Sequence, residues 1–164
     1  GNAGEVGHMR LADFGPAGYG KEGSFEGFCS GGGVKQLGVT LGKRAVQSGV
    51  HPAYFTGDWE AVSAKTIAQA AQAGDETARE VYRLCGEKLG QALSVLVDVL
   101  NPDRIVIGSI YARSGELLEE AMQRVMRREC LPQNLAVAKV VPAELGETLG
   151  DCAALCVAEY GLTR

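Results

Sequence analysis

The sequence lacks the patterns that mark several large classes of protein. No apolar run approaches the ~18 residues that a membrane-spanning helix needs, and the glycine-rich start does not resemble a signal peptide. With 16 basic and 20 acidic residues the net charge is -4, and no basic stretch predicts a nucleic-acid surface on this chain. Hydrophobic residues make up 46% and charged residues 22%, which is ordinary globular usage and excludes disorder.

Cysteine and histidine are too few and too scattered to predict a disulfide framework or a metal centre. The five cysteines are an odd number without paired spacing, which predicts free thiols and a reducing, cytoplasmic compartment. No Cys-x-x-Cys is present, and the only histidines are His8 and His51. Cys152 and Cys156, four apart, are either half of a metal site or two small apolar thiols. Because structural zinc needs four ligands, the sequence favours the thiols.

Glycine, by contrast, is abundant and unevenly placed. Of the 23 glycines, 13 lie between Gly1 and Gly42. Turn signals crowd this first part of the chain, whereas helix and strand patterns dominate later. The sequence therefore divides into a glycine-rich loop region over 1–60 and a helical and α/β region over 61–164.

Apolar residues spaced three and four apart predict helices in the first hundred residues. One covers about 32–47, a second begins at the N-cap Ser63, and a long third covers 75–100 with its N-cap at the first residue. Gly86 and Gly90 fall inside the long helix, where glycine lowers helix propensity. We therefore expect another element to pack closely against the long helix at these two positions.

The rest of the chain alternates strand and helix patterns. The β-branched run Arg104–Ile107 lacks polar alternation, which predicts a strand covered on both faces, as in a parallel sheet. Ser114 is expected to cap the next helix, a second strand is expected over 135–141, and a last helix is expected from about Asp151. This order predicts an α/β fold in which helices cover both faces of a parallel or mixed sheet.

Two groups of residues are candidate ligand contacts. Gly108 and Ser109 follow the first strand, where open parallel sheets bind ligands and glycine lets a ligand approach the backbone. The pair also fits a tight turn that binds nothing, and spacing alone favours the turn. Glu5, His8 and Glu26 stand beside glycines, and two carboxylates with an imidazole suit a polyhydroxylated ligand. From these residues alone, loop side chains facing water are an equal alternative.

Four segments, in order along the chain, carry a family resemblance. They are GNAGEVGHM (1–9), GSFEGFCSG (23–31), NPDRIVIGS (101–109) and LGDCAALCVA (149–158). Together they resemble the ROK family, which groups bacterial sugar kinases with sugar-responsive repressors. The resemblance covers essentially the whole of this chain. It corresponds to the C-terminal half of the complete proteins of the family. It implies the C-terminal lobe of an actin-like ATPase (ribonuclease H-like) fold, with the N-terminal lobe absent from 1–164.

The resemblance assigns roles to single positions. Glu5 and His8 match a Glu-x-Gly-His motif that holds sugar hydroxyls, and Glu26 matches a second sugar-binding glutamate. Gly108 falls in a glycine turn that approaches ATP and its Mg²⁺, although Ser109 and the isoleucine after it replace the usual further glycines. The family's catalytic aspartate lies in the absent lobe, so the resemblance assigns no catalytic residue here and implies that the chain alone phosphorylates nothing.

The resemblance favours the C-terminal part of a cytoplasmic, ATP-dependent hexose kinase. The alternative is the sugar-sensing domain of a ROK-type transcriptional repressor, whose DNA-binding element would lie outside this chain. Neither a nucleic acid nor a membrane is expected to bind the chain itself. A homodimer is expected, because the apolar face over 153–158 would meet the absent lobe in this family.

The sequence departs from the family at its zinc site. Many members bind zinc through the histidine and three cysteines of a Cys-x-Cys-Gly-x-x-Gly-Cys-x-Glu stretch. Ala17, Tyr19 and Ser24 stand at the cysteine positions here, so no zinc is predicted. We expect packing of Tyr19 and Phe25 to hold this loop instead, and a hydrogen bond to orient His8.

Overall fold

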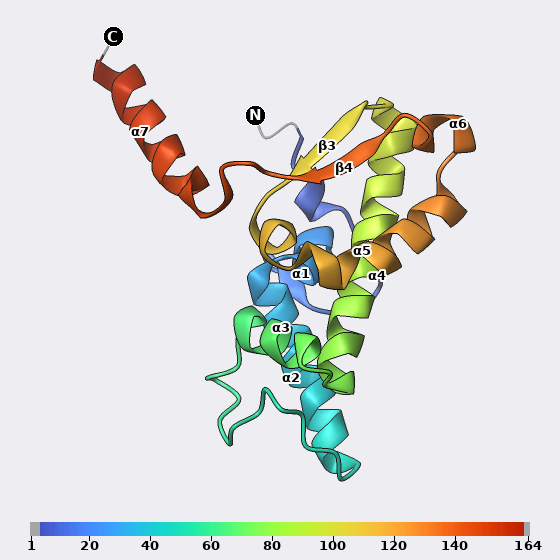
Figure 1. The fold of residues 1–164 in the computed structure, drawn as a ribbon, viewed down its shortest axis with the longest axis vertical. Coiled ribbons are helices and arrows are strands. Elements are labelled where there is room, and N and C mark those ends of the chain that lie inside the picture. The colour runs from blue at the N-terminus through green and yellow to red at the C-terminus, as the bar shows by residue number, and fades with distance from the viewer. Residues whose placement is uncertain (1–3, 163–164) are drawn as a thin grey trace.

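A computed structural model describes residues 4–162, without the side chains of residues 147 and 149, as an α/β protein in which helices dominate. The N-terminal part contains the 3-10 turn η1 (Val6–His8), the strands β1 (Ala17–Gly18) and β2 (Lys21–Glu22), and the helix α1 (Phe25–Cys29). The long helices α2 (Gly31–Gln47), α3 (Ala64–Gln72) and α4 (Glu76–Leu100) follow. The C-terminal part contains β3 (Arg104–Ile107), α5 (Ser109–Glu129), α6 (Pro132–Leu135), β4 (Lys139–Pro142), the turn η2 (Gly146–Thr148) and α7 (Leu149–Leu162) (Figure 1).

The helix starts agree with the capping residues in the sequence. The Ser63 hydroxyl accepts a hydrogen bond from the Thr66 amide, and the Thr66 hydroxyl accepts one from the Ser63 amide, which completes a capping box. Asp75 accepts from the Ala78 amide at the start of α4. The predicted caps of α3 and α4 are therefore confirmed.

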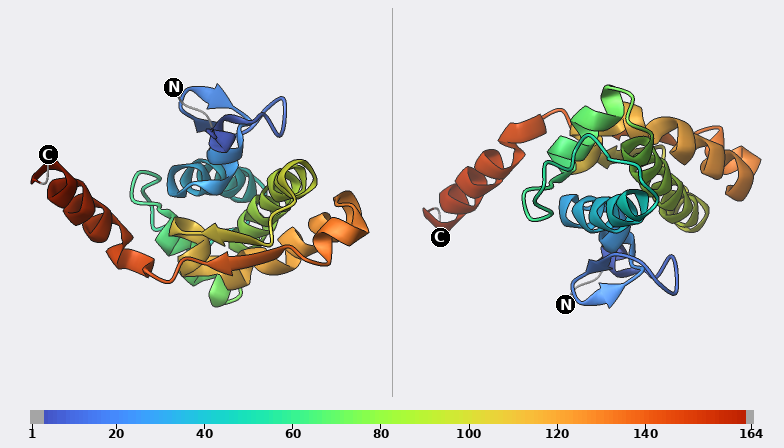
Figure 2. Two further views of the ribbon diagram at one scale, coloured as in Figure 1. Left: turned by 90° about the horizontal axis from the view of Figure 1, so that it is seen from above. Right: turned by 90° about the horizontal axis from the view of Figure 1, so that it is seen from below.

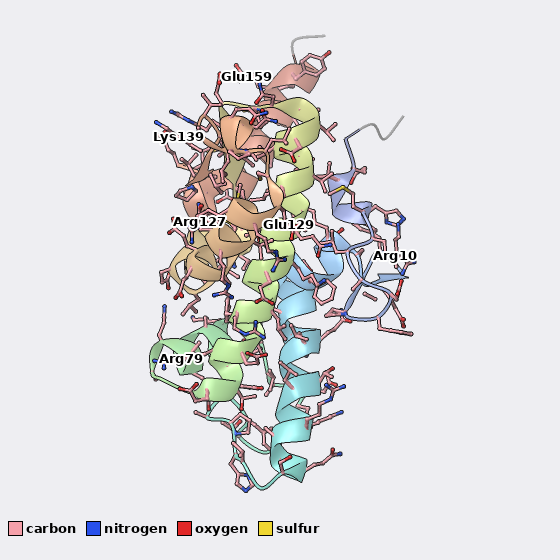
Figure 3. All side chains as sticks on the ribbon, turned by 90° about the vertical axis from the view of Figure 1, so that its right-hand side faces the viewer. Arg10, Arg79, Arg127, Glu129, Lys139 and Glu159 are labelled. Carbon is pink, nitrogen blue, oxygen red and sulfur yellow. The ribbon has the colours of Figure 1, made fainter. Side chains whose placement is uncertain are left out.

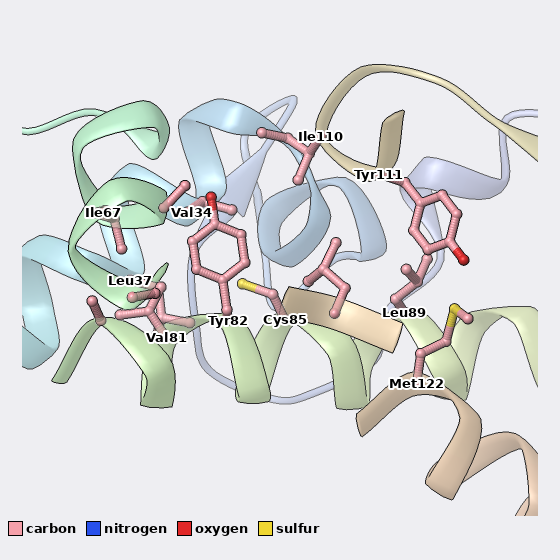
Figure 4. Packing of buried hydrophobic residues seen from close by; sticks show 14 of the residues in the cluster. Val34, Leu37, Ile67, Val81, Tyr82, Cys85, Leu89, Ile110, Tyr111 and Met122 are labelled. Atoms are coloured by element: carbon pink, nitrogen blue, oxygen red, sulfur yellow. The ribbon is translucent and has the colours of Figure 1, made fainter. Parts of the chain in front are cut away.

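The core is built around α4. Tyr82, Cys85 and Leu89 point from one face of this helix into a cluster of buried apolar side chains (Figure 4). The two glycines of α4 lie against α5, as expected from their cost to the helix. A Cβ built on Gly86 would lie 2.5 Å from the Leu118 carbonyl oxygen, and one built on Gly90 would lie 2.5 Å from that of Met122. Only glycine lets the two backbones approach this closely.

The two C-terminal strands form a parallel pair, as predicted. Arg104 is opposite Lys139, and the register continues to the end of both strands. The expected covering of both faces is wrong for β3. Ile105 is half-buried, whereas Val106 is 61% exposed, so only one face packs against helices. A run of β-branched residues indicates a strand, but the elements that pack against the strand decide whether one or both of its faces are buried.

The start of one helix and the start of one strand also differ from the expected positions. The helix α5 begins at Ser109, and Ser114 lies inside it at a kink with φ -144° and ψ 29°, instead of capping its start. Pro132 begins the one-turn helix α6, so the expected strand over 135–141 is shortened to β4. Proline suits the first position of a helix, because its fixed φ is helical and its missing amide hydrogen is not needed there.

The last helix projects away from the rest of the chain (Figures 1 and 2). Leu155 and Val157 on α7 are 70% and 72% exposed. This exposure agrees with the expected lack of a partner for the apolar face over 153–158, and the homodimer remains a prediction. All five cysteines are free thiols. Within residues 4–162, no helix is long and apolar enough to cross a membrane.

Candidate functional site

Backbone hydrogen bonds hold the segment after His8 against the segment before Glu26. The Phe25 amide donates to the Met9 carbonyl at 2.8 Å, and the Leu11 amide donates to the Gly23 carbonyl at 2.8 Å. Figure 2 shows this N-terminal segment outside the helix layer, on the side away from β4. Two motifs that are far apart in the sequence are thereby brought to one place.

The position of Glu26 follows from the start of α1. Ser24 is fully buried, and its hydroxyl accepts a hydrogen bond from the Gly27 amide at 3.0 Å, which caps the helix. Glu26, in the first turn, is half-buried and lies beside η1. A Cβ built on Gly7 would lie 3.4 Å from Cβ and 3.5 Å from Oε2 of Glu26. The glycine between Glu5 and His8 therefore lies next to the Glu26 side chain, at a distance that corresponds to ordinary van der Waals contact.

A cavity of about 370 Å³ joins the two groups of candidate residues. Glu26 and the turn formed by Gly108 and Ser109 are among the residues that line it. Its walls are mostly apolar and come from α1, α2, α4, β3 and α5. The wall residues include Phe25, Cys29, Val34, Cys85, Leu89, Ile107, Ile110 and Leu118.

Glu5 and His8 do not belong to the lining of this cavity. Both side chains are exposed at the ends of η1, while Gly7 between them does line the cavity. The backbone segments that carry Glu5, His8 and Glu26 therefore lie together, but of these three residues only Glu26 lines the cavity. The roles of Glu5, His8 and Glu26 in sugar binding remain predictions.

The turn before α5 leaves the first amides of this helix without a side-chain cap. Gly108 is the N-cap of the helix. Helix N-termini attract anions because free amides and the helix dipole both point toward them. Ser109 adopts a positive φ of 51°, which is strained for a residue with a side chain. Ile110 and Tyr111 after it are buried in the core.

Two cysteines in the cavity wall were not singled out by the sequence. The Cys29 thiol donates to the Cys85 carbonyl at 3.7 Å. Burial raises the pKa of the Cys29 thiol well above its usual value, and it raises the pKa of the Cys85 thiol to about 12. Both groups are therefore neutral thiols at physiological pH and act as apolar wall, because the thiolate is the nucleophile.

Hydrogen bonds, and not the expected packing of Tyr19, hold the loop that follows η1. Tyr19 is 82% exposed at the tip of the β1–β2 hairpin, so that expectation is wrong. Phe25 does pack against the core cluster. The Gln36 side chain donates to the Ala17 carbonyl and accepts from the Ala17 amide, both at 3.0 Å. Lys21 Nζ donates to the His8 backbone carbonyl at 2.6 Å. The hydrogen bond expected to orient the His8 ring remains a prediction.

The described residues form no cluster of the side chains that usually bind a metal ion. Among the side chains that are described, no three from His, Cys, Asp and Glu lie close enough to hold a metal ion. Ser24, at one cysteine position of the zinc-binding members, is instead buried as a helix cap. The absence of zinc remains a prediction from the sequence.

A model of the ROK family matches residues 1–159. The chain belongs to the ROK family. It is 28% identical over 146 residues to an N-acetylglucosamine repressor of Escherichia coli O6:H1, covering 88% of this chain and 34% of that protein. It is 30% identical over 155 residues to a glucokinase of Halalkalibacterium halodurans, covering 92% of this chain and 46% of that protein. The chain thus spans between a third and a half of the relatives that it matches.

A solved structure confirms the similarity of fold. The ROK glucokinase from Streptomyces griseus, in complex with glucose and AMPPNP, superposes with a TM-score of 0.73 at 24% identity. The match covers 89% of this chain and 48% of that one. Together with the family match, this confirms the expected membership and an α/β architecture of the ROK type. The family contains both sugar kinases and sugar-responsive repressors, and the comparisons include both.

Proposed function

We propose that this chain forms the C-terminal, sugar-binding lobe of a longer ROK protein that acts as an ATP-dependent hexose kinase. The observation that carries the proposal is the shared cavity of Glu26 and the Gly108–Ser109 turn. A sugar kinase must hold the hydroxyl groups of the sugar next to the phosphates of the nucleotide. We assign the hydroxyl groups to Glu26 and the phosphates to the Gly108–Ser109 turn. The similarity to a glucokinase supports the same assignment.

The proposed roles follow from the chemistry of each group. The Glu26 carboxylate accepts hydrogen bonds from neighbouring hydroxyls of the sugar. Glu5 and His8, on the adjacent turn, contact further hydroxyls, and the imidazole is able to donate or accept. Together they fix the orientation of the acceptor hydroxyl, and positioning is a large part of catalysis in phosphoryl transfer.

The N-terminus of α5 fits the phosphates of a nucleotide. Its first amides lack a side-chain cap, and Gly108 and Ser109 line the same cavity as Glu26. ATP with Mg²⁺ supplies the phosphoryl group when it is bound. The role of this chain is to orient the phosphates through the backbone at Gly108 and Ser109.

A second candidate is the sugar-sensing domain of a transcriptional repressor. The positive φ and the side chain of Ser109 favour it, because a residue larger than glycine limits how closely a nucleotide approaches the turn. The similarity to an N-acetylglucosamine repressor favours it as well. The sugar contacts are the same in both candidates, and nucleotide binding separates them.

A titration followed by NMR tests the proposal. Glucose, N-acetylglucosamine and xylose are added in turn to the chain, and amide shifts over 4–10 and 24–30 are expected for at least one sugar. Glu26→Gln is expected to lower the affinity at least about tenfold, since a hydrogen bond to a charged group contributes roughly 1.5–3 kcal/mol. Glu119→Gln, a change of an exposed glutamate on α5, is the matched control and leaves the affinity unchanged.

The same titration with AMPPNP distinguishes the two candidates. Shifts of the amides over 108–111 support the kinase. Sugar binding without any response to AMPPNP supports the repressor. If no sugar shifts any amide over 4–10 or 24–30, the sugar site is not where we propose it.

A further inference from the structure

The turn that carries the Glu-x-Gly-His motif is too short to be stable by itself. Within η1, the His8 amide donates to the Glu5 carbonyl at 3.2 Å, and the Met9 amide donates to the Val6 carbonyl at 3.0 Å. A single 3-10 turn fixes several backbone dihedrals for very few hydrogen bonds, so it does not persist without outside contacts. What holds η1 from outside therefore decides where Glu5 and His8 lie.

Two hydrogen bonds from other segments reach the C-terminal end of η1. One comes from the Phe25 amide to the Met9 carbonyl at 2.8 Å, and it belongs to the backbone. The other comes from Lys21 Nζ to the His8 carbonyl at 2.6 Å. The carbonyls at the end of a helix lack partners within it, and an ammonium group is a strong donor for them. The lysine bond is the one that a substitution is able to remove.

The strand that carries Lys21 is itself anchored. Lys21 pairs with Gly18 across the β1–β2 hairpin, and Arg10 donates to the Glu22 carbonyl at 2.9 Å. The Gln36 side chain fixes the neighbouring Ala17 to α2 through its two hydrogen bonds. Figure 3 shows Arg10 on this N-terminal segment, on the opposite side of the molecule from Arg127 and Lys139. Lys21 therefore connects η1 to a support that is continuous with the helical core.

We infer that Lys21 is a positioning residue for the sugar site: its ammonium group holds the end of η1 that bears His8 in place relative to Glu26. This inference rests on the function proposed above. Lys21 touches no sugar in this account. It acts through the His8 backbone, while Gly7 of the same turn lies against the Glu26 carboxylate.

Lys21→Met tests the inference, because methionine keeps an apolar stem and removes the donor. We expect sugar affinity to fall by up to about tenfold, because sugar binding must then supply the free energy that the Lys21 bond contributed to ordering η1. Lys21→Arg restores a cationic donor and is expected to recover most of the affinity. Lys65→Met, on the exposed face of α3, is the matched control and leaves the affinity unchanged. If Lys21→Met does not fold, Lys21→Gln gives the same comparison.

The imidazole NMR signals supply a readout that does not depend on the sugar. The chain has two histidines, so His51 is an internal reference for His8. Lys21→Met is expected to shift the His8 signals and leave those of His51 in place, and Lys21→Arg is expected to reverse the shift. Unchanged His8 signals in Lys21→Met overturn the inference. Failure of the wild-type chain to bind any sugar overturns the proposed function, whereas the His8 signals still decide the role of Lys21.

Discussion

The N-terminal segment and the helical core are held together by different forces. Over 4–30 the elements are short, and their positions depend on hydrogen bonds such as those of Ser24, Gln36 and Lys21. From α2 to α5 the elements are long and bury a continuous apolar cluster. Apolar burial is non-directional and supplies most of the folding free energy, whereas hydrogen bonds fix geometry with a smaller net contribution. The proposed sugar contacts Glu5, His8 and Glu26 therefore lie in a segment whose position depends more on hydrogen bonds than that of the helical core does.

The largest expected effect comes from the α4–α5 contact. Gly90→Ala places a Cβ 2.5 Å from the Met122 carbonyl oxygen and 2.9 Å from the Val125 Cβ, so the two helices must separate. We expect the free energy of unfolding to fall by about 3 kcal/mol, at the upper end of overpacking effects. Chemical denaturation measures the loss.

The control for this change lies on the last helix. A Cβ built on Gly161 meets nothing within 4 Å, so Gly161→Ala is expected not to destabilise the protein. If the comparison of regions is correct, Gly90→Ala lowers sugar affinity less than Ser24→Ala does, measured at a temperature where both variants are folded. A large loss of affinity in folded Gly90→Ala would show that the core and the site are not separable.

A smaller effect is expected from the cap of α1. Ser24→Ala removes the hydroxyl that accepts from the Gly27 amide, which lowers the free energy of unfolding by roughly 1 kcal/mol. Sugar affinity is expected to fall as well, because this cap fixes the turn that bears Glu26. Ser48→Ala, at the exposed end of α2, is the matched control. Loss of stability without any loss of affinity would contradict the link between the cap and the site.

The smallest effect is a pH dependence in the core. Burial, together with the Asp75 carboxylate, raises the pKa of Tyr54 to about 12, and its hydroxyl donates to the Gly38 carbonyl at 2.8 Å. Since the unfolded phenol titrates near ~10, this stabilisation is complete below pH ~10 and is lost as the pH rises through about 12.

Alkaline denaturation curves measure this loss. We expect Tyr54 to account for about 1 kcal/mol of the stability lost between pH 8 and 11. Tyr54→Phe flattens that part of the curve, while Tyr19→Phe, a change of an exposed tyrosine, leaves it as it is in the wild type. The same slope in wild type and Tyr54→Phe would contradict the assignment.

The sequence predicted the long elements well, because local signals determine them. Ser63 and Asp75 cap helices where expected, and Gly86 and Gly90 mark a close helix contact. The β1–β2 hairpin and the exposure of Val106 were not predicted, because they depend on which segments meet in space. The role of Lys21 was also hidden, since an amino-acid sequence does not show which backbone carbonyl a lysine reaches.

For the candidate site, the sequence named the residues, the resemblance assigned their roles, and the structure supplied their arrangement. Glu26 and the Gly108–Ser109 turn share a cavity, which spacing along the chain did not indicate. Glu5 and His8 are exposed beside it. Their participation in sugar binding remains a prediction.

Hydrogen exchange of the chain with and without a saturating sugar tests the central claim most directly. Sugar bound by Glu5, His8 and Glu26 is expected to slow amide exchange over 5–9 and 24–30. Exchange in the middle of α4 is expected to stay the same, because its amides are already protected by the packed core. Protection confined to α4 and α5, with no change over 5–9 and 24–30, would contradict the claim that the hydrogen-bonded N-terminal segment is the sugar site.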